Sequence, residues 1–209
     1  MPIPIGALRI DMFMELVSTI ISFTIGYYSL KGYRVSSEKG LLLLHFGFIT
    51  LGVSMLLRVI TTGYVLVFFR AFSVLPTTIR FAMELASIIY SIMQLIAYAL
   101  FASTYVRQAK MVSEGKAIGA IFLLLYNPYL ELIAVVLLGY VTIQSIINLA
   151  MKKGIETMLV SLGFSFMFLS HLFFLFAIVD ETLYMIGQLI QMAGFICLLI
   201  MLMRVSKIK

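Results

Sequence analysis

Six long apolar runs dominate this chain and restrict what it can fold into. Each holds close to the ~20 residues that a helix needs to cross the hydrocarbon of a bilayer. Of the 209 residues, 63% are hydrophobic and 11% are charged, which leaves too little polar surface to cover a soluble domain of this size. The sequence therefore predicts an all-α integral membrane protein. The apolar runs are 11–30, 41–57, 85–106, 129–151, 158–179 and 183–203.

A seventh, shorter apolar run lies between Lys116 and Pro128. Its sequence, AIGAIFLLLYN, makes about 16 Å of helix, whereas the hydrocarbon is about 30 Å thick. A helix over about 112–127, with Lys116 reaching the headgroups, is about 25 Å long and crosses a locally thinned bilayer. The alternative is one long kinked helix that fuses this run with the next one.

The basic residues decide between these alternatives. With seven spans, most Lys and Arg residues lie on one side of the membrane, in four short segments. Because basic residues of short loops gather on the cytoplasmic side, the chain is predicted to cross the cell membrane seven times, with its N-terminus outside and its C-terminus inside. Fusing the two runs would export the basic C-terminus. The four segments are 31–40, 107–116, 152–156 and 204–209.

The chain also repeats itself. YSIMQLIAYALF at 90–101 and YMIGQLIQMAGF at 184–195 lie 94 positions apart and share their tyrosine, their glutamine and several apolar residues. In the earlier part of each half, the two halves align at an offset of 116 positions. Because the offset then falls to 94, the first half contains extra residues, and this insert lies at about 60–81. We expect this insert to lie on the outer membrane interface, with no straight helix through Pro76.

These observations predict one transmembrane domain over residues 1–209. Repeat one covers about 8–107, a linker helix about 112–127, and repeat two about 128–205. A single span between two three-helix repeats makes the repeats parallel. This 3+1+3 layout resembles that of the SWEET-type sugar transporters and of the opsin-like seven-helix proteins, and the resemblance is one of layout alone. In transporters built from parallel repeats the substrate site lies at the repeat interface.

Several polar residues recur at equivalent positions of the two repeats. Each glutamine of the repeated motif follows a tyrosine by one helical turn, and a serine of the preceding span lies at a similar depth. Hydrogen bonds between helices explain these residues most simply. The alternative is that they surround a small polar substrate site on the pseudo-two-fold axis. The set is Tyr90, Gln94 and Ser54, with the counterparts Tyr184, Gln188 and Ser170.

Two further pairs align in the same way. Glu15 and Glu131 stand near the start of equivalent spans, where carboxylates either complement the helix dipole or form an outer entrance. Gly47 and Gly163 are predicted to allow close helix packing. Arg58 has no counterpart, and we expect it to form an ion pair with Glu84 at the membrane interface.

Metal, cofactor and catalytic sites are not predicted. The two histidines, His45 and His171, lie at heights that differ by about 13 Å, which excludes a bis-histidine haem. No Cys/His group has zinc spacing, and neither a phosphate-binding glycine loop nor a nucleophile elbow occurs. An enzyme is therefore the least expected class. Nucleic acid is not an expected partner either, because no basic platform with interleaved aromatic residues occurs.

Two function classes remain. The duplication and the repeated polar residues favour a facilitator or channel for a small polar solute or ion. The alternative is a non-transporting accessory, scaffold or sensor subunit of a larger membrane complex, with the aromatic insert at 60–81 as its docking surface. The partners expected are the lipid bilayer, an unidentified solute or ion, and either a second membrane protein or another copy of the chain.

Overall fold

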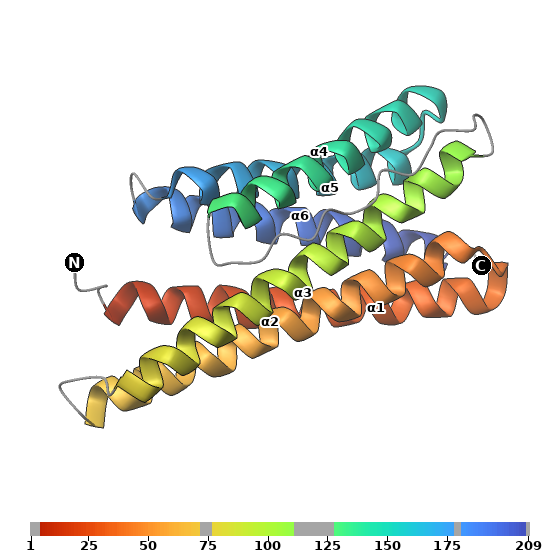
Figure 1. Cartoon of the computed structure of the whole chain (residues 1–209). Coiled ribbons are helices and arrows are strands. Elements are labelled where there is room, and N and C mark those ends of the chain that lie inside the picture. Colours follow the sequence, from red (N-terminus) through yellow and green to blue (C-terminus); the bar gives the residue numbers. More distant parts are fainter. Residues whose placement is uncertain (1–4, 72–76, 111–127, 178–180, 208–209) are drawn as a thin grey trace.

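The computed structural model describes residues 5–71, 77–110, 128–177 and 181–207, and these residues form six α-helices and no strand (Figure 1). Each helix contains a segment long and apolar enough to cross a membrane. The prediction of an all-helical chain with several membrane-spanning helices is therefore confirmed. The helices are α1 (Ile5–Ser36), α2 (Lys39–Ala71), α3 (Thr77–Lys110), α4 (Pro128–Met151), α5 (Ile155–Phe176) and α6 (Glu181–Lys207).

The helices form a closed ring in which each one packs against two neighbours. The order around the ring follows the chain, and α6 closes it against α1. The first three helices can be exchanged in order with the last three: α1 with α4, α2 with α5 and α3 with α6. After this exchange, every pair of neighbouring helices is again a pair of neighbours. For example, the pair α1 and α6 becomes the pair α4 and α3. The ring is therefore compatible with a two-fold relation between its halves.

The neighbouring helices α3 and α4 run in the same direction, as do α1 and α6 (Figure 1). Two consecutive antiparallel helices need only a short turn, such as the one that joins α1 to α2. The end of α3 and the start of α4, by contrast, lie at opposite ends of the bundle (Figure 1). The linker helix predicted at about 112–127 lies outside the described residues.

Polarity in this bundle is arranged for an apolar surrounding. Large apolar side chains such as Phe13, Tyr27 and Val136 are more than half exposed on the outside of the ring. Serines, glutamines and a glutamate are buried inside it. This distribution suits lipid as the solvent of the outer face, because lipid tails favour apolar contacts and give buried polar groups no competing partner.

Four phenylalanines, which we call the phenylalanine layer, fill the middle of the ring: Phe48, Phe101, Phe164 and Phe195. All are buried, and Phe101 is in ring contact with two of the others, at centroid distances of 4.6 Å to Phe48 and 5.8 Å to Phe164. The four are two pairs in the sequence alignment of the halves. The core is therefore built from equivalent positions of both halves.

The insert predicted at 60–81 does not form a separate segment along the membrane interface. Residues 60–71 continue α2, and residues 77–81 begin α3. The two helices extend past the rest of the bundle at one end (Figure 1). The described part of α2 ends at Ala71 and α3 begins at Thr77, so the prediction for Pro76 lies outside the described residues.

Candidate functional site

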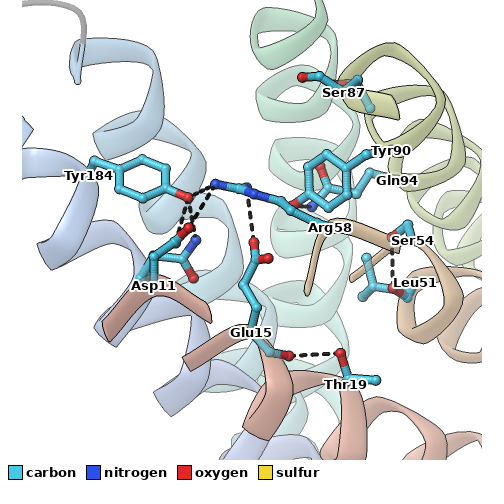
Figure 2. A network of polar contacts seen from close by, with 12 residues as sticks. Asp11, Glu15, Thr19, Leu51, Ser54, Arg58, Ser87, Tyr90, Gln94 and Tyr184 are labelled. Carbon is cyan, nitrogen blue, oxygen red and sulfur yellow. Dashed lines mark hydrogen bonds and ion pairs between the residues drawn. The ribbon is translucent and has the colours of Figure 1, made fainter. Parts of the chain in front are cut away.

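The guanidinium of Arg58 lies where α1, α2, α3 and α6 meet (Figure 2). Its Nη1 atom is 3.0 Å from Oε1 of Glu15, and its Nη2 atom is 3.5 Å from Oδ2 of Asp11. The Arg58 side chain is 27% exposed, whereas that of Glu15 is only 2% exposed. Arg58 thus joins the inside of the bundle to the end at which α1 begins, which we call the Arg58 end.

The same guanidinium binds both tyrosines of the repeated motif. Arg58 Nη1 donates to Tyr90 Oη at 3.3 Å, and Nη2 donates to Tyr184 Oη. The guanidinium carbon lies 5.0 Å and 5.4 Å from the two ring centres, within the range of cation–π attraction. Tyr184 Oη in turn donates to Asp11 Oδ1 at 2.8 Å. We call these five residues, Asp11, Glu15, Arg58, Tyr90 and Tyr184, the Arg58 cluster.

Both predicted glutamines donate hydrogen bonds to the tyrosines of this cluster. Gln94 Nε2 donates to Tyr90 Oη at 2.7 Å, and Gln188 Nε2 donates to Tyr184 Oη at 2.9 Å. Both glutamines are buried. Each predicted tyrosine and glutamine therefore forms a bonded pair within its own helix, and Arg58 bridges the two pairs.

The two predicted serines are buried near these pairs but bond differently. Ser54 Oγ donates to the carbonyl of Leu51, and Ser170 Oγ donates to that of Met167, each at 2.7 Å. Both bonds stay within the helix that carries the serine. Whether the two hydroxyls also line a substrate site stays a prediction.

The second predicted carboxylate, Glu131, pairs with a histidine. Glu131 Oε2 is 2.7 Å from Nδ1 of His171, and His171 Nε2 is 2.6 Å from the hydroxyl of Tyr98. His171 and Tyr98 are buried, whereas the Glu131 side chain is 32% exposed. With Glu131 ionised and His171 neutral, Nδ1 donates to the carboxylate and Nε2 accepts from Tyr98. The chain of three groups leads from the partly exposed carboxylate into the core.

The two equivalent glutamates thus bind different bases. Arg58 aligns with Phe174 in the second half, and His171 aligns with Met55 in the first. The charges also differ, because in the first half two carboxylates, Asp11 and Glu15, face one guanidinium. Glu15 forms its ion pair with Arg58, and the Gln188 side chain lies nearby. Within the described residues, however, neither oxygen of Glu15 accepts a hydrogen bond.

Two sequence interpretations change. The expected ion pair between Arg58 and Glu84 is wrong, because Arg58 turns inward to α1 while Glu84 is exposed. Glu15 does not lie at an open helix end but is buried against Arg58. The sequence reading missed Arg58, Asp11, His171 and Tyr98 as members of the polar networks. A basic residue inside an apolar run was the available signal for Arg58.

The two predicted packing glycines lie at close helix contacts. A Cβ atom on Gly47 would be 2.4 Å from Cε1 of Phe101, and one on Gly163 would be 2.6 Å from Cγ of Leu198. Real Cβ atoms do not approach that closely, so only glycine fits without a shift of the neighbours. These contacts hold α2 against α3 and α5 against α6.

Among the described residues no group of three His, Cys, Asp or Glu side chains could hold a metal ion. Compared with known proteins, the chain matches no family model, no curated protein and no solved structure. The function is therefore argued from the geometry of the two polar networks.

Proposed function

We propose that this chain is a membrane transport protein, a facilitator or channel for a small polar solute or ion. The observation that carries the proposal is the position of Arg58, which bonds to Tyr90 of the first half and to Tyr184 of the second. One cationic group thereby joins two equivalent Tyr–Gln pairs across the interface of the halves. In transporters with parallel repeats, substrate sites lie at that interface. Ionisable groups inside a membrane bundle typically mark such pathways.

The layers of the bundle support the same proposal. At the Arg58 end the polar cluster is partly exposed, as the 27% exposure of Arg58 shows. About 10 Å further along α3, seven residues after Gln94, the phenylalanine layer fills the interior. A polar cluster that is partly exposed on one side and covered on the other side by aromatic side chains fits a site occluded from that other side.

We also propose the complete membrane arrangement. Because α3 and α4 run in the same direction, the chain between them has to return to the other end of the bundle (Figure 1). A seventh span at about 112–127 would do so and would give two parallel repeats in a 3+1+3 layout. The basic segments then lie inside the cell, with the N-terminus and the Arg58 cluster toward the outside of the cell membrane.

Flux through proteoliposomes tests the transport function. Replacing Gln94 or Gln188 by Leu removes the donor to its tyrosine and places an apolar group beside the proposed site. We expect each variant to fold and to lose most of its flux, to a similar extent. Gln144 of α4 is half-buried outside the Arg58 cluster, and Gln144→Leu is the matched control.

The assay would screen sugars, amino acids and common ions, with the melting temperature of each variant as the folding control. Full flux in both Gln→Leu variants would contradict the proposed site. If the wild-type protein showed no flux above empty liposomes for any solute, the transport function itself would be wrong.

One observation favours an accessory subunit as the second candidate. Val67, near the end of α2, and Phe81, near the start of α3, are each 68% exposed. Such an exposed apolar surface fits a docking surface for another membrane protein. Extraction in mild detergent would then yield a larger complex of fixed stoichiometry, and this complex would be lost in a Val67→Ser, Phe81→Ser variant.

A further inference from the structure

Helix α1 carries a line of polar side chains on the face that is turned into the bundle. Glu15, Ser18, Ser22 and Ser29 follow one another at spacings of three, four and seven residues, which keeps them on one helix face. All four are buried. From Glu15 to Ser29 the line covers about 21 Å, roughly two-thirds of the hydrocarbon thickness.

Several polar atoms on this line lack a hydrogen-bond partner, although Oε1 of Glu15 forms the ion pair with Arg58 at 3.0 Å. Thr19 and Thr24 of the same helix donate to the carbonyls four residues earlier. The hydroxyls of Ser22 and Ser29 and both oxygens of Glu15, by contrast, make no hydrogen bond within the described part of the chain. A buried polar group without a partner costs about 1–3 kcal/mol. Several such atoms along one face indicate that water or a ligand completes them.

The equivalent helix of the second half has no such line. Ala134 takes the place of Ser18 and Leu138 that of Ser22. Ser145 aligns with Ser29, but its hydroxyl donates to the carbonyl of Thr142 at 2.8 Å. Of the two equivalent helices α1 and α4, only α1 therefore carries the polar line.

At the end remote from Arg58 the line leads to a cavity of about 290 Å³ between α1, α2 and α6. Its lining includes Tyr28 and Gly32 of α1, which flank Ser29, and one residue of each charge, Lys31 and Glu38. Ile25 lies between Ser22 and Ser29 on the same face and is fully buried. Apart from Ile25, buried polar residues continue along this face of α1 from Glu15 to Ser29, and the cavity lies beside the end of the line.

The charge at the start of the line selects the ligand. Asp11 and Glu15 together carry two carboxylates, whereas Arg58 supplies one guanidinium. Carboxyl oxygens are ligands for cations, and Oε2 of Glu15 makes neither a hydrogen bond nor an ion pair within the described residues. We propose that α1 lines a hydrated path for a small monovalent cation, separate from the central Tyr–Gln space, and that Ile25 closes it. This path does not depend on solute transport at the proposed site.

Silver ion is a suitable probe, because it is a small monovalent cation that binds thiolates. Single cysteines would replace Ser22 and, as the matched control, Leu138, each in a Cys197→Ala background. Vesicles in chloride-free buffer would be exposed to Ag⁺, and the thiols still free would then be alkylated in denaturant and counted by mass spectrometry. Cysteine is close in size to serine, so the Ser22→Cys variant should keep the fold.

We expect Ag⁺ to block the cysteine at position 22 at least about tenfold faster than the one at 138, because each 1.4 kcal/mol of ion desolvation slows access tenfold. Adding Glu15→Gln should slow the reaction at position 22. Equal rates at positions 22 and 138 would overturn the path even if solute flux were found. Rapid reaction at position 22 would support it even if no solute were transported.

Ile25 is tested separately by ion leak. Ile25→Ser should raise the leak of H⁺, Na⁺ or K⁺ through proteoliposomes, and the ion that leaks identifies the cation. Val141 is the equivalent buried residue of α4, and Val141→Ser is the control that should leave the leak unchanged. An Ile25→Ser protein that is folded but no leakier than the control would overturn the closure at Ile25.

Discussion

Tyr90 and Tyr184 stand at equivalent positions of the two halves, and their hydroxyls accept hydrogen bonds from the same guanidinium. The contact between Arg58 and Tyr184 joins residues 126 positions apart in the chain. Tyr184 also donates to Asp11, and this bond joins α6 to α1, so the closing contact of the ring is fixed by a polar network as well as by packing. Disturbing this network should affect both stability and function, and its charge balance makes the effect predictable.

Removing Arg58 should destabilise the protein because Asp11 and Glu15 then lose their cationic partner. We expect Arg58→Met to lower the free energy of unfolding by on the order of 3 kcal/mol. Adding Glu15→Gln to it should recover part of that loss. The chain has no Trp, so melting is best followed by circular dichroism in detergent. A double variant that melts as low as the single one would contradict this charge balance.

His171 should be needed for its two hydrogen bonds. His171→Met introduces the residue found at the equivalent position, Met55, and leaves the buried hydroxyl of Tyr98 unpaired. We expect a loss of about 1–3 kcal/mol, because one buried polar group loses its partner. Tyr98→Phe in the same protein should restore part of the stability. Additive losses in the double variant would show that the two side chains do not interact.

The two packing glycines should not tolerate a methyl group. Gly47→Ala and Gly163→Ala should each cost about 1–3 kcal/mol, because Phe101 and Leu198 have to move in a filled core. Gly63→Ala is the control, since a Cβ there meets only Met12 Sδ at an ordinary 3.6 Å. Thermal unfolding of the three variants gives the comparison. Equal melting temperatures for all three would argue against close packing at Gly47 and Gly163.

Chemical labelling should reveal the direction of insertion. Ser36, at the end of α1, and Thr182, at the start of α6, lie at opposite ends of the bundle (Figure 1). In cells expressing single-cysteine variants without Cys197, an impermeant thiol reagent should label position 182 and spare position 36. Position 113, outside the described residues, should be spared as well. Labelling at 113 with protection at 182 would instead support the fused helix.

Helix lengths were predictable only where the chain is apolar. The first run was predicted to end at residue 30, yet α1 continues to Ser36 through Lys31 and Arg34. Hydropathy detects the part of a helix that lies in hydrocarbon, whereas hydrogen bonds of the backbone extend the helix into the headgroup region. Residues 60–71 were expected to leave α2 because the change of offset between the halves marked them as an insert, and they instead continue the helix.

The duplication identified the Tyr–Gln pairs but concealed their shared partner. Tyr90 and Gln94 recur as Tyr184 and Gln188, and a repeated polar residue is conspicuous in an apolar background. Arg58 has no counterpart, so alignment of the halves gave it no role. Its partners lie on α1, α3 and α6, and the packing of the ring brings these helices together around it. Such tertiary pairing leaves no periodic signal.

The difference between Arg58 and its counterpart Phe174 also bears on how such a bundle can be assembled. A homodimer of the first half alone would bring two guanidiniums and four carboxylates to one axis, and a homodimer of the second half would bring none of the Arg58 and Asp11 charges. Neither half could therefore form by self-association a cluster that holds a single guanidinium and two carboxylates. Covalent linkage in a single chain guarantees that each molecule receives one copy of each half.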